Sequence, residues 1–182
     1  MVPDDYIDTL IGREAGYVNN PSDKGGETIW GITVAVARAY GYTGPMRNMP
    51  RTTAEGIYRS RYWLLPKLDQ INAVDPKLAE KLLDIGVNMG QSTGITFLQR
   101  ALNVLNMQGK AFPDIARDGS IGPMTMAALK AYYVQRGAEA SGVLVKMIAG
   151  QQSVRYIELA EKDAMQEAFE FGWQRARAFF GI

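Results

Sequence analysis

The chain has 182 residues, the length of one domain or of one domain with a small appendage. Its apolar fraction of 47% is normal for a globular protein and too high for a disordered one. Lys and Arg number 20 and Asp and Glu number 19, so the net charge of +1 favours no particular partner. Nothing in the sequence is typical of a nucleic-acid-binding stripe.

The chain contains neither Cys nor His. The absence of Cys excludes disulfides, thiolate zinc sites and cysteine nucleophiles. The absence of His removes the usual general base near neutral pH and the commonest metal ligand. Acid–base chemistry must therefore use carboxylates, Lys, Tyr or water. Glycoside hydrolysis by a pair of carboxylates is the main example of such chemistry.

The N-terminal segment has early acidic residues, no basic region and no apolar core of signal length, so it predicts no secretory signal. No uninterrupted apolar run approaches the ~18 residues of a membrane span. We therefore expect the protein to be made in the cytoplasm without a signal peptide.

The first residues predict an amphipathic helix that ends near Gly16. Pro3 suits the first turn of a helix, and the two acids after it suit the positive end of the helix dipole. An apolar stripe with the spacing i, i+3, i+4, i+7 contains Ile7, Leu10, Ile11 and Glu14. The stripe thus places one carboxylate on the side expected to face the core.

Residues 16–32 break this helical rhythm. Gly and Pro are frequent there and are separated by Asn, Ser and Asp. Such a composition predicts an irregular loop or a short hairpin. We therefore expect a small loop or hairpin lobe near residues 16–32.

Helical periodicity resumes after this lobe and continues to the end of the chain. Thr33 is a helix cap, and Thr52 with Glu55 is a capping-box pattern. The expected helices cover residues 33–41, 52–62, 75–89, 95–107, 123–136 and 144–180, the last with breaks near Gly150 and Gly172. There is no linker composition and no repeat, so the sequence predicts one mostly α unit with a looser boundary near residue 92.

Glu14 is the first candidate for acid catalysis. A carboxyl group on the apolar side of a helix loses solvation, which raises its pKa, and a Glu tuned in this way can donate a proton near neutral pH. The alternative is an ordinary Glu at a helix end that turns to solvent or caps a buried amide.

Asp23 and Thr28 are the next candidates, because they lie in the lobe that follows Glu14. A carboxylate in a polar loop keeps a low pKa and stays ionised, so Glu14 and Asp23 have the contrasting environments that glycosidases use. The hydroxyl of Thr28 can position the attacking water. As alternatives, Asp23 forms a turn and Thr28 makes a loop hydrogen bond.

Three consecutive segments resemble the signature of the glycoside hydrolase 108 muramidases, which are endolysins and prophage lysozymes. Residues 14–19 read E-A-G-Y-V-N, residues 21–28 read P-S-D-K-G-G-E-T, and residues 31–33 read G-I-T. The family motif begins E-G-G-Y. The resemblance therefore implies that Glu14 is the catalytic glutamate, with Ala15 in place of the usual first Gly.

The order Glu14, Asp23, Thr28 is also similar to the catalytic triad of T4-type phage lysozymes. Eight residues separate the Glu from the Asp, as in that family, but four residues rather than five separate the Asp from the Thr. This departure does not affect Glu14. It makes Glu27 a competitor of Asp23 for the role of the second carboxylate.

Residues 58–63, Y-R-S-R-Y-W, resemble the Y-R-x-x-Y-W segment of the glycoside hydrolase 108 family. Tyr58 and Tyr62 are one helical turn apart, so they share a helix face. They either form a wall against which a sugar ring lies or pack as an aromatic pair.

Residues 84–90, D-I-G-V-N-M-G, resemble the family's D-x-x-x-N-x-G segment. Asp84 and Asn88 are also one turn apart. They either bind the N-acetyl group of a sugar or orient the loop, or they satisfy buried amides; the latter suits Asp84 better than Asn88.

Residues 118–125, D-G-S-I-G-P-M-T, resemble the D-G-x-x-G-x-x-T turn of peptidoglycan-binding helical modules. Physically, the motif is a turn that leads into a helix, and this role requires no ligand. The aromatic tail at residues 171–180 contains two Arg residues. It either rests weakly on an anionic membrane surface or docks as a C-terminal helix.

The resemblance implies a mainly α, lysozyme-like fold. Residues 1–92 would form the catalytic part, and residues 93–182 would form a helical peptidoglycan-binding part packed on it as one globular unit. The implied reaction is hydrolysis of the β-1,4 bond between N-acetylmuramic acid and N-acetylglucosamine, with Glu14 as general acid. The alternatives are a lytic transglycosylase that uses the same Glu and a non-catalytic peptidoglycan-binding protein.

The expected partner is the glycan strand of peptidoglycan. We expect no nucleic-acid partner, and no metal or cofactor because the sequence contains no ligand cluster, and we expect a monomer. The resemblance further implies release across the inner membrane by a holin, so that the enzyme acts in the periplasm or cell wall.

Overall fold

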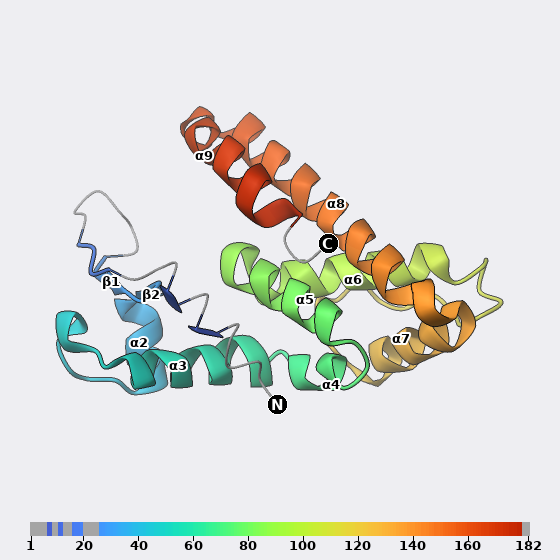
Figure 1. Cartoon of the computed structure of the whole chain (residues 1–182), viewed down its shortest axis with the longest axis horizontal. Helices are drawn as coiled ribbons and strands as arrows, with labels where there is room; N and C mark the ends of the chain where they lie inside the picture. The colour runs from blue at the N-terminus through green and yellow to red at the C-terminus, as the bar shows by residue number, and fades with distance from the viewer. Residues whose placement is uncertain (1–6, 9–10, 13–15, 20–25, 180–182) are drawn as a thin grey trace. The chain divides into compact units, whose positions relative to one another are not determined.

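The computed structural model describes residues 7–8, 11–12, 16–19 and 26–179. The chain divides into two compact units, Met1–Leu65 (unit 1) and Pro66–Ile182 (unit 2). Helices dominate the described residues, and the strands of the sheet there are two residues long (Figure 1). The prediction of a mainly α fold with a small hairpin lobe is therefore confirmed.

Unit 1 contains a hairpin followed by short helices. Its elements are β1 (Thr28–Ile29), β2 (Ile32–Thr33), α2 (Val34–Tyr40), the 3-10 helix η1 (Met46–Asn48), α3 (Arg51–Ile57) and the π-helix η2 (Tyr58–Leu64). Thr33 caps α2 as predicted, because its Oγ1 accepts a hydrogen bond from the backbone N–H of Val36 at 3.4 Å. Gly41 ends α2 with a φ of 102°, which favours glycine.

α3 begins two residues earlier than the capping-box pattern predicts, because Pro50 and not Thr52 precedes its first residue. The helix starts after Pro50, and no side chain caps it. Glu55 does not supply the expected bond to a backbone N–H group. Its carboxylate instead accepts a hydrogen bond from Nε of Arg51 at 3.1 Å, and Arg51 also pairs with Asp8 at 2.6 Å. The ion pair one turn away thus replaces the expected cap.

The core of unit 1 includes two members of the predicted apolar stripe. Ile7 and Ile11 are 2% and 0% exposed, and they share the interior with Ile32 of β2 and Trp63 of η2. The helical spacing of the first segment therefore predicts its buried side correctly at the described positions.

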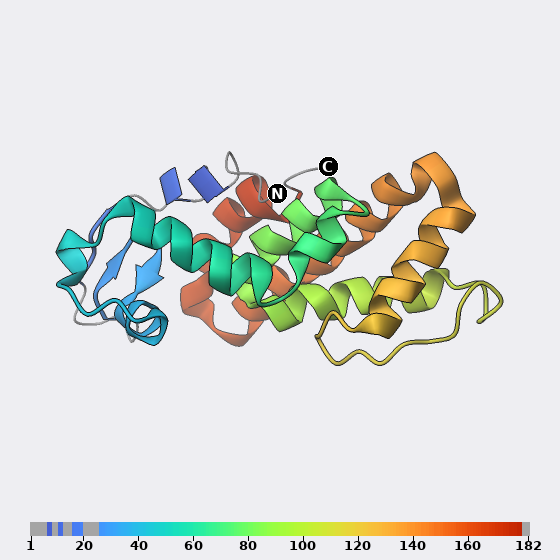
Figure 2. The same ribbon diagram turned by 90° about the horizontal axis from the view of Figure 1, so that it is seen from below.

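Unit 2 is built from longer helices. Its elements are α4 (Leu68–Asn72), α5 (Pro76–Met89), α6 (Gln91–Leu105), α7 (Pro123–Arg136), η3 (Gly137–Glu139), α8 (Ala140–Lys162), η4 (Ala164–Gln166), α9 (Glu167–Trp173) and the π-helix η5 (Gln174–Ala178). α8 packs against α5 and α6, and α9 and η5 fold back along α8 (Figures 1 and 2).

The expected helix break near Gly150 is absent. Gly150 lies inside α8, which continues to Lys162, and the chain turns at Asp163 instead. A single Gly weakens a helix without ending it, and packing of α8 against its neighbours keeps the helix continuous.

Asp75 fixes the start of α5 and connects it to two other helices. Its Oδ1 accepts hydrogen bonds from the backbone N–H groups of Lys77 and Leu78 at 2.9 and 3.2 Å, and so caps the helix. Its Oδ2 accepts one from Ser141 of α8 at 2.8 Å and another from the hydroxyl of Tyr133 of α7. Burial and this carboxylate raise the pKa of Tyr133.

The D-G-x-x-G-x-x-T segment folds around one buried side chain, that of Gln99 on α6. Its Nε2 donates to Oδ1 of Asp118 at 2.8 Å, to the carbonyl of Ser120 at 3.0 Å and to Oγ1 of Thr125 at 3.2 Å. Its Oε1 accepts from the backbone N–H of Gly119 at 3.0 Å. The first and last residues of the motif thus hold Gln99, which gives the motif a structural role without a ligand.

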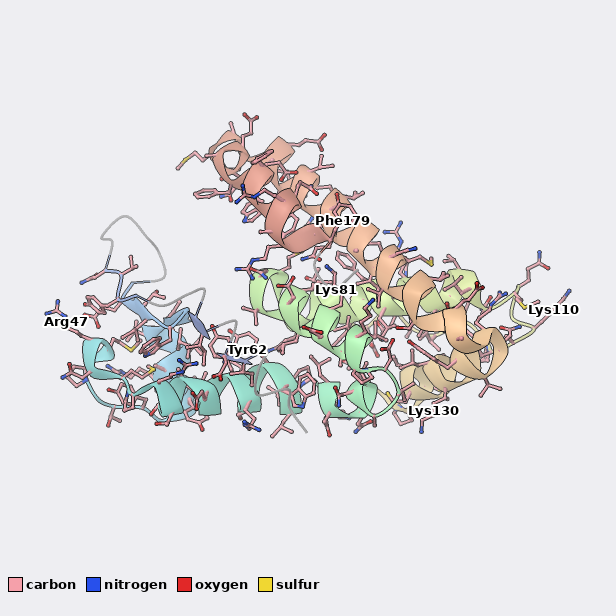
Figure 3. All side chains as sticks on the ribbon, in the orientation of Figure 1. Arg47, Tyr62, Lys81, Lys110, Lys130 and Phe179 are labelled. Carbon is pink, nitrogen blue, oxygen red and sulfur yellow. The ribbon has the colours of Figure 1, made fainter. Side chains whose placement is uncertain are left out.

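Lys81 on α5 is a buried cation with 1% of its surface exposed. Its Nζ donates to the backbone carbonyls of Arg177 and Ala178 at 3.0 and 2.7 Å, and so binds the end of η5 (Figure 3 labels Lys81 and the nearby Phe179). Burial lowers the pKa of Lys81 to about 8, while the negative charge of Asp84 opposes this shift.

Among the described helices, none combines the length and the apolar character that crossing a bilayer requires.

We predict that the free energy of unfolding rises above pH 8 because of Lys81. In the folded chain Lys81 loses its proton near pH 8, whereas in the unfolded chain it keeps the proton until its ordinary pKa of 10.5. The unfolded state binds more protons between these values, so stability increases with pH, by about 2 kcal/mol up to about pH 9.5. Urea denaturation of the wild type and of Lys81→Met across this range measures the difference.

Lys77→Met is the matched control, because Lys77 is exposed on the same helix. The control should show the wild-type rise with pH, and Lys81→Met should not. An identical pH dependence in all three proteins would show that Lys81 does not titrate as predicted.

Candidate active site

The hairpin of unit 1 contains two of the candidate residues, Glu27 and Thr28. Thr28 pairs with Thr33 in the antiparallel β1–β2 ladder. On its other side it forms a bridge with Val18, through two backbone N–H···O bonds of 2.8 Å. The hydroxyl of Thr28 donates to the carbonyl of Gly26 over a long 3.4 Å. Thr28 is therefore held by its backbone on both sides while its hydroxyl is only weakly bound.

Trp30 and Gly31 form the turn of this hairpin, with φ values of 56° and 72°. Two positive φ values are typical of the type I′ turn that suits a two-residue hairpin, but they are rare for a bulky residue. Two hydrogen bonds hold Trp30 in this conformation. Its Nε1 donates to the carbonyl of Met49 at 3.0 Å, and its own carbonyl accepts from the hydroxyl of Tyr58 at 3.0 Å.

Glu27 belongs to a small polar cluster with Tyr17 and Arg47. The hydroxyl of Tyr17 donates to Oε1 of Glu27 at 2.8 Å. The guanidinium carbon of Arg47 lies 4.9 Å from the centre of the Tyr17 ring, within cation–π distance (Arg47 is labelled in Figure 3). The cluster therefore joins two residues of the motif, one of them a carboxylate, to a cation from outside it.

Glu14 and Asp23 lie outside the described residues. Their predicted roles as acid and second carboxylate therefore stay predictions. The described residues that follow them in the chain, Gly16 and Tyr17 in one case and Gly26 and Glu27 in the other, belong to the lobe discussed above.

Tyr58 and Tyr62 pack against each other, with ring centres 5.4 Å apart and planes at 34°. Tyr58 is 1% exposed, and its hydroxyl is bound to Trp30. Tyr62 is half-buried (labelled in Figure 3). This placement favours the packed pair for Tyr58, and it leaves Tyr62 as the ring of the two that reaches the surface.

Asp84 lies fully inside unit 2, with 0% of its surface exposed. Its Oδ1 accepts from Arg177 at 3.3 Å, and its Oδ2 accepts from Nε2 of Gln152 at 3.3 Å. Asn88 adds a longer contact of 3.4 Å to Oδ1. Because protein donors surround the carboxylate, the structure favours the structural interpretation of Asp84 over sugar binding.

Asn88, one turn further along α5, is exposed, and its Nδ2 donates to the backbone carbonyl of Asp84 at 2.7 Å. It lines a cavity of about 280 Å³ together with Arg155, Tyr156 and Trp173. The rings of Tyr156 and Trp173 stack with their centres 5.0 Å apart. An amide, aromatic rings and a cation are groups suited to a sugar, so Asn88 keeps its place as a candidate for substrate binding.

The sequence did not single out Tyr17, Arg47 or Tyr156, and it marked Trp173 only as part of the aromatic tail. Tyr17 lies inside the motif that resembles the family, and this position was the available signal. Arg47 and Tyr156 reach their partners through the tertiary fold, and no local pattern marks them. In the part of the chain that the structure describes, no group of three or more acidic side chains is arranged to hold a metal ion.

Comparison with known proteins gives two family matches. Residues 7–90 match the family described as "Glycosyl hydrolase 108", and residues 93–178 match the family described as "Predicted Peptidoglycan domain". The solved structure described as "Structure of Brucella abortus SagA" is similar in fold, with a TM-score of 0.58 and 21% sequence identity over 97% of both chains. A comparison with curated proteins gives no match.

We predict that Tyr58→Phe destabilises the chain by about 1–2 kcal/mol, because it leaves the carbonyl of Trp30 without this donor. Tyr62→Phe is the matched control from the same aromatic pair and should change stability by less than about 0.5 kcal/mol. Chemical denaturation measures both. Equal effects of the two substitutions would show that the bond from Tyr58 to Trp30 does not hold the hairpin.

Proposed function

We propose that the chain is a muramidase, a glycoside hydrolase that acts on peptidoglycan, because residues 7–90 match the glycosyl hydrolase 108 family and residues 93–178 match the predicted peptidoglycan domain family. The proposed reaction is hydrolysis of the β-1,4 bond between N-acetylmuramic acid and N-acetylglucosamine. The observation that carries the proposal is that the glycosyl hydrolase match contains the whole motif from Glu14 to Thr33.

In the proposed mechanism, Glu14 protonates the departing glycosidic oxygen. By its spacing in the sequence, Glu14 belongs to the same predicted stripe as Ile7 and Ile11, and both of these residues are buried. An apolar surrounding raises the pKa of a carboxyl group and keeps it protonated near neutral pH, as a general acid requires. The buried stripe therefore supports Glu14 as the acid.

The second carboxylate supports the positive charge of the oxocarbenium-like transition state or deprotonates the attacking water. We assign this role to Asp23, with Glu27 as the competing residue. Glu27 is held by Tyr17, and Thr28, the next residue, has a hydroxyl that is only weakly bound. Such a hydroxyl is suited to hold the attacking water, which is the role we propose for Thr28. We propose that this chemistry takes place at the cell wall.

We predict that Glu14→Gln lowers the rate of peptidoglycan hydrolysis by ~10²–10⁴-fold without unfolding the protein, since a positioned general acid contributes about that factor. The assay is the release of reducing ends from purified cell walls, with circular dichroism as the folding check. Glu161→Gln, an exposed position on α8, is the matched control and should keep wild-type activity. Wild-type activity of Glu14→Gln would refute the assignment.

Mass spectrometry of the products from the same digests defines the reaction class. A hydrolase product carries one more water than the anhydro product of a lytic transglycosylase. If the wild type releases anhydro products and Glu14→Gln is inactive, Glu14 is the catalytic acid and the enzyme is a lytic transglycosylase instead of a hydrolase. Absence of any wild-type product on a cell-wall zymogram would indicate a non-catalytic binding protein.

We predict that Asp23→Asn lowers the hydrolysis rate at least ~100-fold and that Glu27→Gln lowers it less than ~10-fold, because the proposed mechanism uses only one of these carboxylates. Initial rates of reducing-end release from purified cell walls measure both variants. The reverse order would move the role from Asp23 to Glu27.

A further inference from the structure

Helices α6 and α8 pack against each other in unit 2 (Figure 1). Residues of both helices line a groove with a volume of about 680 Å³. This volume is within the range of roughly 300–1,000 Å³ that is usual for small-ligand sites. One face of each helix forms the walls, and neither Glu27 nor Thr28, the described candidates for hydrolysis, lines them. The groove is therefore a second candidate site, built from residues of unit 2.

The absence of a side chain at Gly150 adds to the volume of the groove. It lies in the middle of α8, and a Cβ atom added there would meet no atom within 4 Å. Gly inside a helix is less stable than Ala, so local helix stability does not explain its presence. The side chains that line the opposite wall on α6 include the short hydroxyl residues Ser92, Thr93 and Thr96.

The charged residues of the groove are suited to an anionic ligand. Arg155 is paired with Glu158 of the same helix at 3.0 Å. Arg100 of α6 is exposed and has no ion-pair partner among the described residues. Because an Arg side chain binds a carboxylate through two parallel hydrogen bonds, Arg100 is available to a ligand that carries one.

Gln151 provides an acceptor at the same groove. Its Nε2 donates to the backbone carbonyls of Phe97 and Met147 at 3.0 and 3.3 Å, which fixes the orientation of the amide. Its Oε1 is buried and accepts no hydrogen bond from a described residue. A buried acceptor without a donor is unfavourable, and an N–H group of a ligand in the groove would supply the donor.

The remaining walls are apolar and are formed by Phe97, Met147 and Val154. Carboxylates, backbone N–H groups and small apolar side chains occur together in a peptide. Glycan strands, by contrast, are bound mostly through their own hydroxyl groups and by stacking on Trp or Tyr rings. No Trp or Tyr lines the described groove. The face of α6 from Ser92 to Arg100 rises ~12 Å, which matches three or four extended residues.

We propose that the α6–α8 groove binds the peptide stem of peptidoglycan. Arg100 pairs with a carboxylate of the stem, a stem N–H group donates to Oε1 of Gln151, and alanine methyl groups lie on the apolar wall. The inference uses the match of residues 93–178 to a peptidoglycan domain and does not depend on the cleavage chemistry assigned to Glu14.

The test is a titration of the full-length protein with a synthetic stem tetrapeptide, L-alanyl-γ-D-glutamyl-L-lysyl-D-alanine, by isothermal titration calorimetry. The wild type should bind the tetrapeptide saturably. An analogue with amidated carboxyl groups should bind at least ~10-fold more weakly, and so should the tetrapeptide to Arg100→Ala, because a charged hydrogen bond is lost in both cases. A tetramer of N-acetylglucosamine should not compete.

Gly150→Leu should abolish binding by filling the groove. Gly142→Leu is the matched control, because Gly142 lies on the same helix, has equal room for a side chain and is outside the groove. It should bind like the wild type. Arg100→Ala keeps the test decisive if Gly150→Leu does not fold, since Arg100 is exposed.

Three results would overturn the proposal: no binding of the tetrapeptide to the wild type, equal binding of the amidated analogue, or unchanged affinity in Arg100→Ala or in a folded Gly150→Leu. Competition by the sugar tetramer would identify a glycan site instead. Because the tetrapeptide contains no glycosidic bond, a negative result leaves the muramidase proposal intact. An inactive wild-type enzyme would likewise leave the binding result intact.

Discussion

The buried carboxylate of Asp84 is the interaction on which unit 2 depends most. It lies on α5 with no exposed surface, and its hydrogen-bond donors come from Gln152 of α8 and Arg177 of η5. A buried carboxylate without partners is strongly destabilising, so α5 needs the C-terminal helices to remain in the core. On the same helix Lys81 needs them too, because its ammonium group donates to the last carbonyls of η5.

This dependence explains why the compact units and the family segments end at different residues. The glycosyl hydrolase match extends to residue 90, whereas the first compact unit ends at Leu65. The end of the hydrolase segment, α5, thus packs within the same unit as the peptidoglycan domain and shares the cavity beside Asn88 with it. The expected division into residues 1–92 and 93–182 stays a prediction, and the buried charges of α5 argue that its first part is not self-sufficient.

Local patterns predict much of the fold, because periodicity and caps depend on neighbouring residues. The expected helix at residues 75–89 is present as α5, with Leu78, Leu82 and Ile85 buried, and Thr33 caps α2 as predicted. The predictions fail where other contacts compete with the local pattern. Packing against α5 and α6 keeps α8 continuous through Gly150. Glu55 pairs with the side chain of Arg51, which also binds Asp8, instead of capping a backbone N–H group.

For the candidate site residues too, local spacing predicts the helix face but not the burial. The D-x-x-x-N spacing puts Asp84 and Asn88 on one helix face, yet the first is buried and the second is exposed, because α5 leaves the core as it approaches Gly90. Tyr58 and Tyr62 also differ in burial. Tyr58 is buried, with its hydroxyl bound to the turn at Trp30, whereas Tyr62 is half-buried. In each motif the buried member supports the fold, and the member nearer the surface remains available to a ligand. A motif that resembles a family signature therefore combines architectural and ligand-binding residues, and only burial in the folded chain distinguishes them.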